Sequence, residues 1–158
     1  MRLKSLLVAI TCSLLTACNQ ASGYEYQNVR ADSLNYSPDV TKIALRQLGK
    51  PYKYGGNGPY HFDCSGLVYY SFSRVGIDVP RSASEQLDHA VRIPVSKLQS
   101  GDLVFFRITQ NKISHVGIYI GGNRFIHSPS AGKHVQIVKL NNPYWRSRFV
   151  AAARIPNR

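Results

Sequence analysis

The segment YHFDCSGLVYYSF, residues 60–72, places a cysteine between an aspartate and apolar residues at helical spacing. Asp63 is a favoured N-cap residue, and we expect the helix that follows it to end at Gly76. Cys64 would then lie in the first turn, where unpaired N–H groups and the helix dipole lower the pKa of a thiol. The negative charge of Asp63 opposes this effect. Because the same N–H groups can stabilise an oxyanion, Cys64 is a candidate nucleophile.

The beginning of the chain has the features of an export signal. Two basic residues precede the apolar run 6–15, which is too short to cross a bilayer core about 30 Å thick. Residues 15–18, Leu-Thr-Ala-Cys, resemble the lipobox of bacterial lipoproteins, whose cysteine carries the lipid. We therefore expect a signal peptide over 1–17 and a lipid on Cys18. The alternative is an ordinary cleavage site with an incidental cysteine.

The residue after the lipobox bears on location. Lipoproteins retained in the inner membrane tend to carry an aspartate there, whereas this chain has Asn19. We therefore expect a lipid anchor in the outer membrane of a Gram-negative cell envelope, with the protein facing the periplasm.

Export would leave Cys64 as the one thiol of the mature protein. The chain has three cysteines; Cys12 would leave with the signal peptide and Cys18 would carry the lipid, so no intramolecular disulfide could form. A free thiol in an oxidising compartment is at risk unless the protein uses it. The alternative interpretation is a small buried hydrophobic residue.

The chain is strongly basic, with a formal net charge of +12. It contains no block of Lys and Arg and no nucleic-acid-binding motif, so the charge does not favour a nucleic-acid partner. It suits long-range attraction to an anionic polymer or membrane surface, and cell-envelope polymers are anionic.

The rest of the chain reads as a tether and one domain. Residues 18–36 are polar without sustained periodicity, as in a flexible linker. In the domain, 37–158, Ser37 and Pro38 begin a helix whose apolar spacing continues to a stop at Gly49. The Gly-, Pro- and Tyr-rich stretch 49–62 is a loop.

Further along, the pattern changes from helix to strand. Ser82 and Glu85 form a capping-box pattern that predicts a short helix. After Gly101, short apolar or alternating runs are separated by turn residues. These runs are 103–108, 115–120, 124–128, 134–140 and 149–155. We therefore expect an α+β fold with N-terminal helices packed on an antiparallel sheet of about five strands.

Two of the five histidines are candidate partners for the cysteine. His61, His89 and His134 lie in loop, polar-helix and strand-start positions typical of solvated side chains. His115 and His127 instead flank VGIYIGGNRFI, which predicts a hairpin. A three-residue turn would put both on the same face, about 7–8 Å apart, whereas a two-residue turn would put them on opposite faces. The sequence leaves this register open, and two unrelated strand-end histidines are the alternative.

Five segments together resemble successive blocks of the NlpC-type cell-wall cysteine peptidases. They are YKYGGNGPYHFDCSGLV (52–68), VPRSASEQ (79–86), SGDLVFF (100–106), HVGIYIG (115–121) and FIHS (125–128). The resemblance extends from about residue 38 to the end. The tail PYWRSRFVAAARI (143–155), together with the lipobox, is most similar to the small outer-membrane lipoproteins of that family.

The resemblance implies a papain-like fold and a set of site residues. Cys64 would be the nucleophile, His115 the general base and His127 the residue that orients it. Tyr52 matches the tyrosine that helps a backbone N–H to hold the oxyanion. Positions near the substrate cleft are matched by Asp63, Ser65, Arg81 and Ser82. Ser100 departs from the proline common in the family, in a turn where it bears on stability more than on chemistry.

The implied activity is hydrolysis of peptide bonds in the stem peptides or cross-links of peptidoglycan, by a monomer that needs no cofactor or metal. Three alternatives stay open. The fold could serve an acyltransferase or another amidase. It could belong to a lipoprotein that binds the cell wall without turnover. A cysteine with His115 and His127 could also imitate a zinc site.

Overall fold

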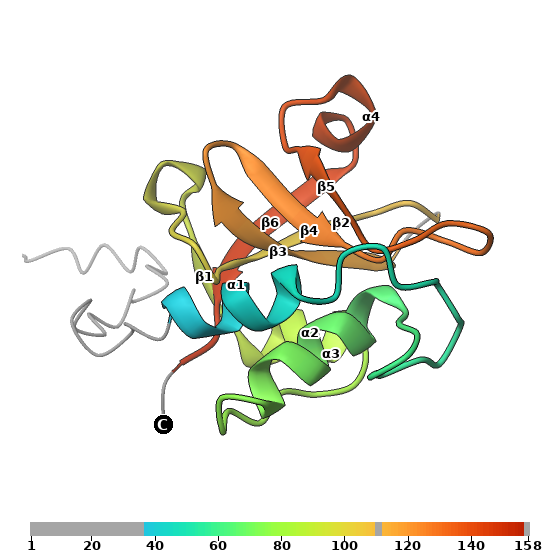
Figure 1. The fold of residues 1–158 in the computed structure, drawn as a ribbon. Coiled ribbons are helices and arrows are strands. Elements are labelled where there is room, and N and C mark those ends of the chain that lie inside the picture. Colours follow the sequence, from blue (N-terminus) through green and yellow to red (C-terminus); the bar gives the residue numbers. More distant parts are fainter. Residues whose placement is uncertain (1–36, 110–111, 157–158) are drawn as a thin grey trace, which may run out of the picture.

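A six-stranded antiparallel sheet, with the first three α-helices gathered on one side, forms the described part of the chain (Figure 1). The computed structural model describes residues 37–109 and 112–156. The expected signal peptide (1–17) and tether (18–36), with Cys18, lie outside the described residues. The helices are α1 (Ser37–Leu45), α2 (Cys64–Ser73), α3 (Ala83–His89), the 3-10 helix η2 (Val95–Lys97) and α4 (Pro143–Arg146). The strands are β1 (Val91–Ile93), β2 (Leu103–Phe106), β3 (His115–Gly121), β4 (Arg124–His127), β5 (Gln136–Lys139) and β6 (Phe149–Arg154).

The α+β class is confirmed, and the expected number of strands was one too low. The strand order is β1-β6-β2-β3-β4-β5, so the last strand of the chain lies between the first two. The missed strand is β1, which pairs with β6 through Val91, Arg92 and Ile93. Three residues between a helix and Pro94 are too few to show alternation. None of the helices in residues 37–109 and 112–156 has the length and hydropathy of a membrane-crossing segment.

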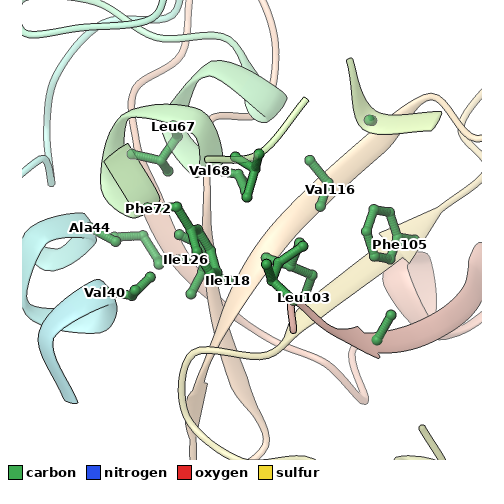
Figure 2. Close-up of a cluster of buried hydrophobic side chains, with 14 of the residues drawn as sticks. Val40, Ala44, Leu67, Val68, Phe72, Leu103, Phe105, Val116, Ile118 and Ile126 are labelled. Atoms are coloured by element: carbon green, nitrogen blue, oxygen red, sulfur yellow. The ribbon is translucent and has the colours of Figure 1, made fainter. Parts of the chain in front are cut away.

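The two faces of the sheet bury different clusters. On the helical side, Leu67, Val68 and Phe72 of α2 pack with Phe105 of β2 and Val116 of β3 (Figure 2). Because successive side chains of a strand point to opposite faces, Val104 and Phe106 of β2 face away from α2, whereas Leu103 shares the face of Phe105. That second face carries a smaller cluster, which contains Val104, Phe106, Phe125, Leu140 and Trp145.

The hairpin between β3 and β4 settles the register that the sequence left open. Gly122 and Asn123 form its turn with positive φ angles of 57° and 58°. A bulge between Tyr119 and Gly121 adds one residue to β3, so Ile118 pairs with Ile126. Continuing this register, His127 falls opposite Gly117 and on the same face as His115. The two-residue turn and the bulge together give the pairing expected of a three-residue turn.

A buried ion pair fixes β6 against the start of β2. The Arg154 Nε and Nη2 atoms donate to the two Asp102 carboxylate oxygens at 2.6 and 2.8 Å. Asp102 also accepts from the Gln99 N–H, and both charged side chains are buried. Losing either partner would leave an uncompensated charge in the interior.

Arg154→Met should lower the free energy of unfolding by about 3–5 kcal/mol, because it leaves the Asp102 carboxylate buried and unpaired. Adding Asp102→Asn removes that charge while keeping an acceptor for the Gln99 N–H, so the double variant should regain part of the loss. Urea unfolding of both variants measures the difference. An Arg154→Met protein as stable as the unmodified chain would contradict this account.

Candidate active site

Asp63 positions Cys64 at the start of α2. Its Oδ1 accepts a hydrogen bond from the Gly66 N–H at 2.7 Å, which is the N-cap contact predicted from the sequence. A Cβ at Gly66 would lie 1.9 Å from the Gly56 carbonyl oxygen, so only glycine lets the helix start approach the loop this closely. The Gly55 N–H donates to Oδ2 of the same carboxylate at 2.9 Å. One side chain therefore fixes both the helix start and the loop beside it.

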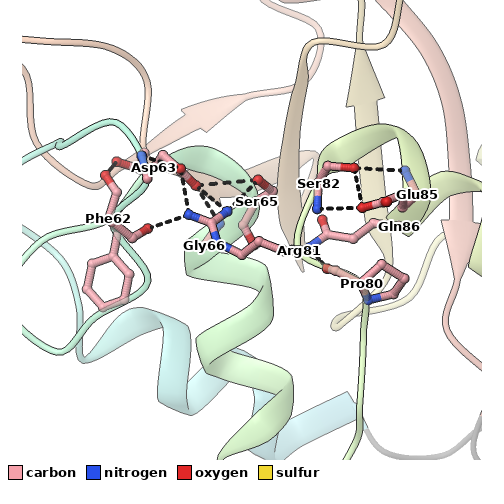
Figure 3. A network of polar contacts seen from close by, with 12 residues as sticks. Phe62, Asp63, Ser65, Gly66, Pro80, Arg81, Ser82, Glu85 and Gln86 are labelled. Carbon is pink, nitrogen blue, oxygen red and sulfur yellow. Dashed lines mark hydrogen bonds and ion pairs between the residues drawn. The ribbon is translucent and has the colours of Figure 1, made fainter.

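Arg81 completes this network (Figure 3). Its guanidinium donates to both Asp63 oxygens, at 2.9 and 2.7 Å, and to the Ser65 hydroxyl at 2.9 Å. A further bond reaches the Gly56 carbonyl at 3.2 Å. The structure thus brings together three of the four residues matched to the substrate cleft. The fourth, Ser82, caps α3 in the predicted capping box with Glu85.

His115 and His127 form a directly bonded pair. His115 begins β3 and His127 ends β4, and His115 Nε2 lies 2.9 Å from His127 Nδ1. The rings are nearly perpendicular, with an interplanar angle of 86°, and both are buried. On its other side, His127 Nε2 lies 3.4 Å from the Gln136 amide nitrogen. Because His127 occupies Nε2 of His115, Nδ1 is the ring nitrogen left to receive a proton from a reacting group.

The Cys64 thiol lies beside the start of β3. The backbone N–H of Val116, next in the chain after His115, acts to lower the pKa of this thiol, as do the N–H groups of Ser65 and of Cys64 itself. These three donors favour the thiolate. The start of α2 therefore lies beside the start of β3, the strand that begins with His115.

The pKa of Cys64 is raised, which corrects the expectation of a lowered value. Burial is the largest cause and the Asp63 charge the second; together they outweigh the backbone N–H groups. Burial also lowers the pKa of His115 to about 4. The pKa of His127 is lowered by burial, then by the charges of His115 and Lys133. At neutral pH the site therefore rests as a neutral thiol beside neutral imidazoles.

An open cleft of about 510 Å³ leads to the thiol. The predicted residues that line it are Tyr52, Asp63, Cys64, Ser65, Arg81 and Ser82. Tyr54 and Lys112 also line it, although the sequence reasoning singled out neither. Burial, followed by the charge of Cys64, raises the pKa of Tyr52, so its hydroxyl remains a hydrogen-bond donor at neutral pH.

The other three histidines differ from the bonded pair in burial: His61 and His89 are partly exposed and His134 is exposed, whereas His115 and His127 are buried. Within residues 37–109 and 112–156, no three His, Cys, Asp or Glu side chains gather in a metal-binding arrangement. The zinc site considered for Cys64 and the two histidines has no geometric counterpart in this part of the chain.

Sequence reasoning missed Trp145, the one tryptophan of the chain. It lies in α4, buried against both histidine rings. Trp145 lies in the tail 143–155 that resembles the family, which was the one sign of its importance. A four-residue helix has no apolar periodicity from which its contact with the histidines could be predicted.

A cysteine at a helix start, next to a histidine pair on an antiparallel sheet, is the arrangement of the cysteine hydrolases. The model of the NlpC/P60 family matches residues 49–154, and the chain belongs to this family. The expected family resemblance is thereby confirmed.

Relatives and a solved structure support this assignment. The chain is 46% identical over 126 residues to "Murein DD-endopeptidase MepH" of Escherichia coli K12, covering 73% of this chain and 46% of that protein. It is 38% identical over 132 residues to "Probable endopeptidase YafL" of the same strain, covering 78% and 53%. The chain therefore spans about half the length of these curated relatives. A crystal structure of an NlpC/P60 family protein from Bacillus cereus ATCC 10987 superposes with a TM-score of 0.72 at 33% identity, covering 77% of this chain and 41% of that one.

The Asp63 charge should be visible in the reactivity of Cys64. Asp63→Asn keeps an acceptor for the Gly66 N–H but removes the charge that raises the thiol pKa, so iodoacetamide alkylation should titrate at lower pH than in the unmodified protein. The midpoint of the alkylation rate against pH is the measurement.

Arg81→Gln is the matched control. It breaks the same ion pair but keeps the carboxylate charge and removes a nearby cation, so the Cys64 midpoint should move to higher pH. Midpoints that move in the same direction in both variants would mean that loss of the network, and not charge, governs the thiol.

Proposed function

We propose that this protein is a cysteine endopeptidase that hydrolyses peptide bonds in peptidoglycan stem peptides or cross-links. The observation that carries the proposal is the placement of the Cys64 thiol, which an open cleft reaches, beside the Val116 N–H. Val116 follows His115 in the chain, and His115 is bonded to His127 over 2.9 Å. The endopeptidase names of the two Escherichia coli relatives agree with it.

The first half of the reaction follows from the resting protonation states. The Cys64 thiol gives its proton to Nδ1 of His115 as the sulfur bonds to the substrate carbonyl carbon. The resulting oxyanion accepts hydrogen bonds from the Tyr52 hydroxyl and a backbone N–H at the start of α2. When the C–N bond breaks, the leaving amine takes the proton from His115 and a thioester remains.

The second half returns the enzyme to its starting state. Water attacks the thioester, His115 accepts a proton from that water, and the thiol leaves with a proton returned from the imidazolium. Throughout, His127 holds His115 through the Nε2–Nδ1 hydrogen bond. Asp63, Ser65 and Arg81 line the substrate side of the cleft. The charges of Asp63 and Arg81 balance each other in their ion pair.

The proposed setting is the cell envelope of a Gram-negative bacterium. A lipid on Cys18 would anchor the protein in the outer membrane facing the periplasm, and residues 18–36 would let a monomeric domain reach the wall. The lipobox pattern and Asn19 support the anchor, and the formal charge of +12 suits an anionic polymer.

Cys64→Ala and His115→Ala should each abolish nearly all turnover, by about 10³-fold or more, because nucleophile and base act as one unit. His127→Asn should keep partial activity, since an orienting residue needs a hydrogen-bonding group and not a titrating one. Mass spectrometry of defined muropeptides after incubation identifies the products and the bond cut. His89→Ala, outside the cleft, is the control.

Other outcomes of that experiment would replace the proposal. Muropeptides joined to an added amine, with little hydrolysis, would indicate an acyltransferase. Binding to peptidoglycan without product would indicate a wall-binding lipoprotein. A fully active His127→Asn protein that also tolerates His127→Ala would remove His127 from the site.

Cys18→Ala should abolish incorporation of radiolabelled palmitate and release the protein from the membrane fraction. The domain should stay folded, as reported by unchanged urea unfolding. Palmitate that still enters the variant would refute the anchor at Cys18.

A further inference from the structure

We propose that Trp145 is a positioning residue for the histidine pair: its indole fixes the ring planes of both histidines and keeps water from the hydrogen bond between them. The inference rests on the proposed function, because it names what positions the base of that same site. Nothing in the expected family roles of Cys64, His115 or His127 involves this residue.

The geometry of the three rings carries the proposal. The Trp145 ring stacks on His115 at 27° with centroids 5.2 Å apart, and meets His127 edge-on at 82° with centroids 4.8 Å apart. The two imidazoles are themselves 86° apart. A flat indole that stacks on the first ring therefore has to meet the second edge-on. Rotation of either histidine away from the 2.9 Å hydrogen bond would break a contact with Trp145.

The indole also covers a side of the pair that the helices do not reach. Trp145 packs with Val104 and Phe106, which face away from α2 on the sheet. Cys64 approaches from the α2 side, where Val116 belongs to the other cluster. Cys64 packs against that cluster and Trp145 belongs to the second one, so the thiol and the indole lie on opposite faces of the sheet. Trp145 is 7% exposed, His115 2% and His127 0%, so little water reaches the pair.

The short helix α4 holds the indole in this place. The Asn142 side chain caps it by accepting from the Tyr144 N–H at 2.9 Å, and Pro143 occupies its first turn. Phe106 and Phe125 contact the indole edge-on at 4.9 and 5.3 Å. The indole is therefore packed against aromatic rings from two strands, β2 and β4.

Removing the indole should change solvent access and leave the charges near the pair unchanged. Among the described residues, the charges that lower the pKa of His127 are those of His115 itself and of Lys133, whereas no charge is a cause of the low pKa of His115. Gln136 from β5 is neutral, and the neighbours from β2, β4 and α4 are the rings of Phe106, Phe125 and Trp145. Burial is the cause of the low pKa of His115. Admitting water should therefore raise that pKa toward its ordinary value of 6.5.

Trp145→Leu in the full-length chain is the test. It should lower kcat by roughly 10- to 100-fold with KM little changed, because the base is misplaced while the cleft is intact. His115 must be neutral to accept a proton, so a raised pKa should move the acid limb of kcat/KM to higher pH. Trp145→Phe keeps an aromatic ring and should recover most of kcat, with a smaller shift in the same direction; it also serves if the leucine variant does not fold.

Phe149→Leu is the matched control. Phe149 contacts Phe106 edge-on at 6.0 Å in the same aromatic cluster, but makes no ring contact with either histidine among the described residues. It should lower the free energy of unfolding without moving the acid limb. If Trp145→Leu lowers stability in the same way and also leaves kcat and the acid limb unchanged, Trp145 is a core residue only and the proposal is overturned.

Histidine titration by NMR separates this inference from the proposed function. The imidazole signals of His115 and His127 report their pKa values whether or not peptidoglycan is cleaved. An unmodified protein without turnover would remove the proposed function. Under that outcome, a raised His115 pKa in the tryptophan variants still supports Trp145 as the cover of the pair, and an unchanged pKa rejects it.

Discussion

The Asp63 carboxylate is the constraint on which the rest of the site depends. It caps α2 through Gly66, binds the Gly55 N–H of the neighbouring loop and pairs with both donor arms of Arg81. Each of these contacts fixes a different segment relative to Cys64. Because Arg81 in turn binds Ser65, the ion pair joins the first turn of α2 to the segment that precedes α3. One short side chain can do this because hydrogen bonds to a charged group are shorter and roughly twice as strong as those between neutral groups.

That arrangement has an electrostatic consequence for the thiol. A carboxylate next to Cys64 disfavours a second negative charge, and burial disfavours any charge at all. The backbone N–H groups at the helix start oppose both effects without outweighing them. Burial likewise keeps the imidazoles neutral, so in the proposed reaction the proton would move when the sulfur attacks and not before. For that proposed reaction, the position of the general base would be more important than a preformed thiolate.

Local features were well predicted from the sequence, and those that depend on the environment were not. The Asp63 cap and the Ser82–Glu85 capping box follow from residue types at fixed spacing, and both are present. The hairpin register could not be chosen, because the bulge before Gly121 combines a two-residue turn with three-residue pairing. The sign of the Cys64 pKa shift was wrong, since burial arises from the packing of distant segments and has no local signature. The same holds for the contact of Trp145 with histidines on β3 and β4.

The raised pKa also bears on why a lone thiol could persist in the proposed location. Oxidants attack the thiolate, so susceptibility follows thiolate character and exposure. Cys64 is partly buried and rests protonated, whereas a thiolate formed at rest would be exposed to the same oxidants at all times. Transfer of its proton to His115 would coincide with a substrate filling the cleft and excluding solvent. The charge and burial that work against a thiolate at rest are therefore compatible with a site that forms one only during attack.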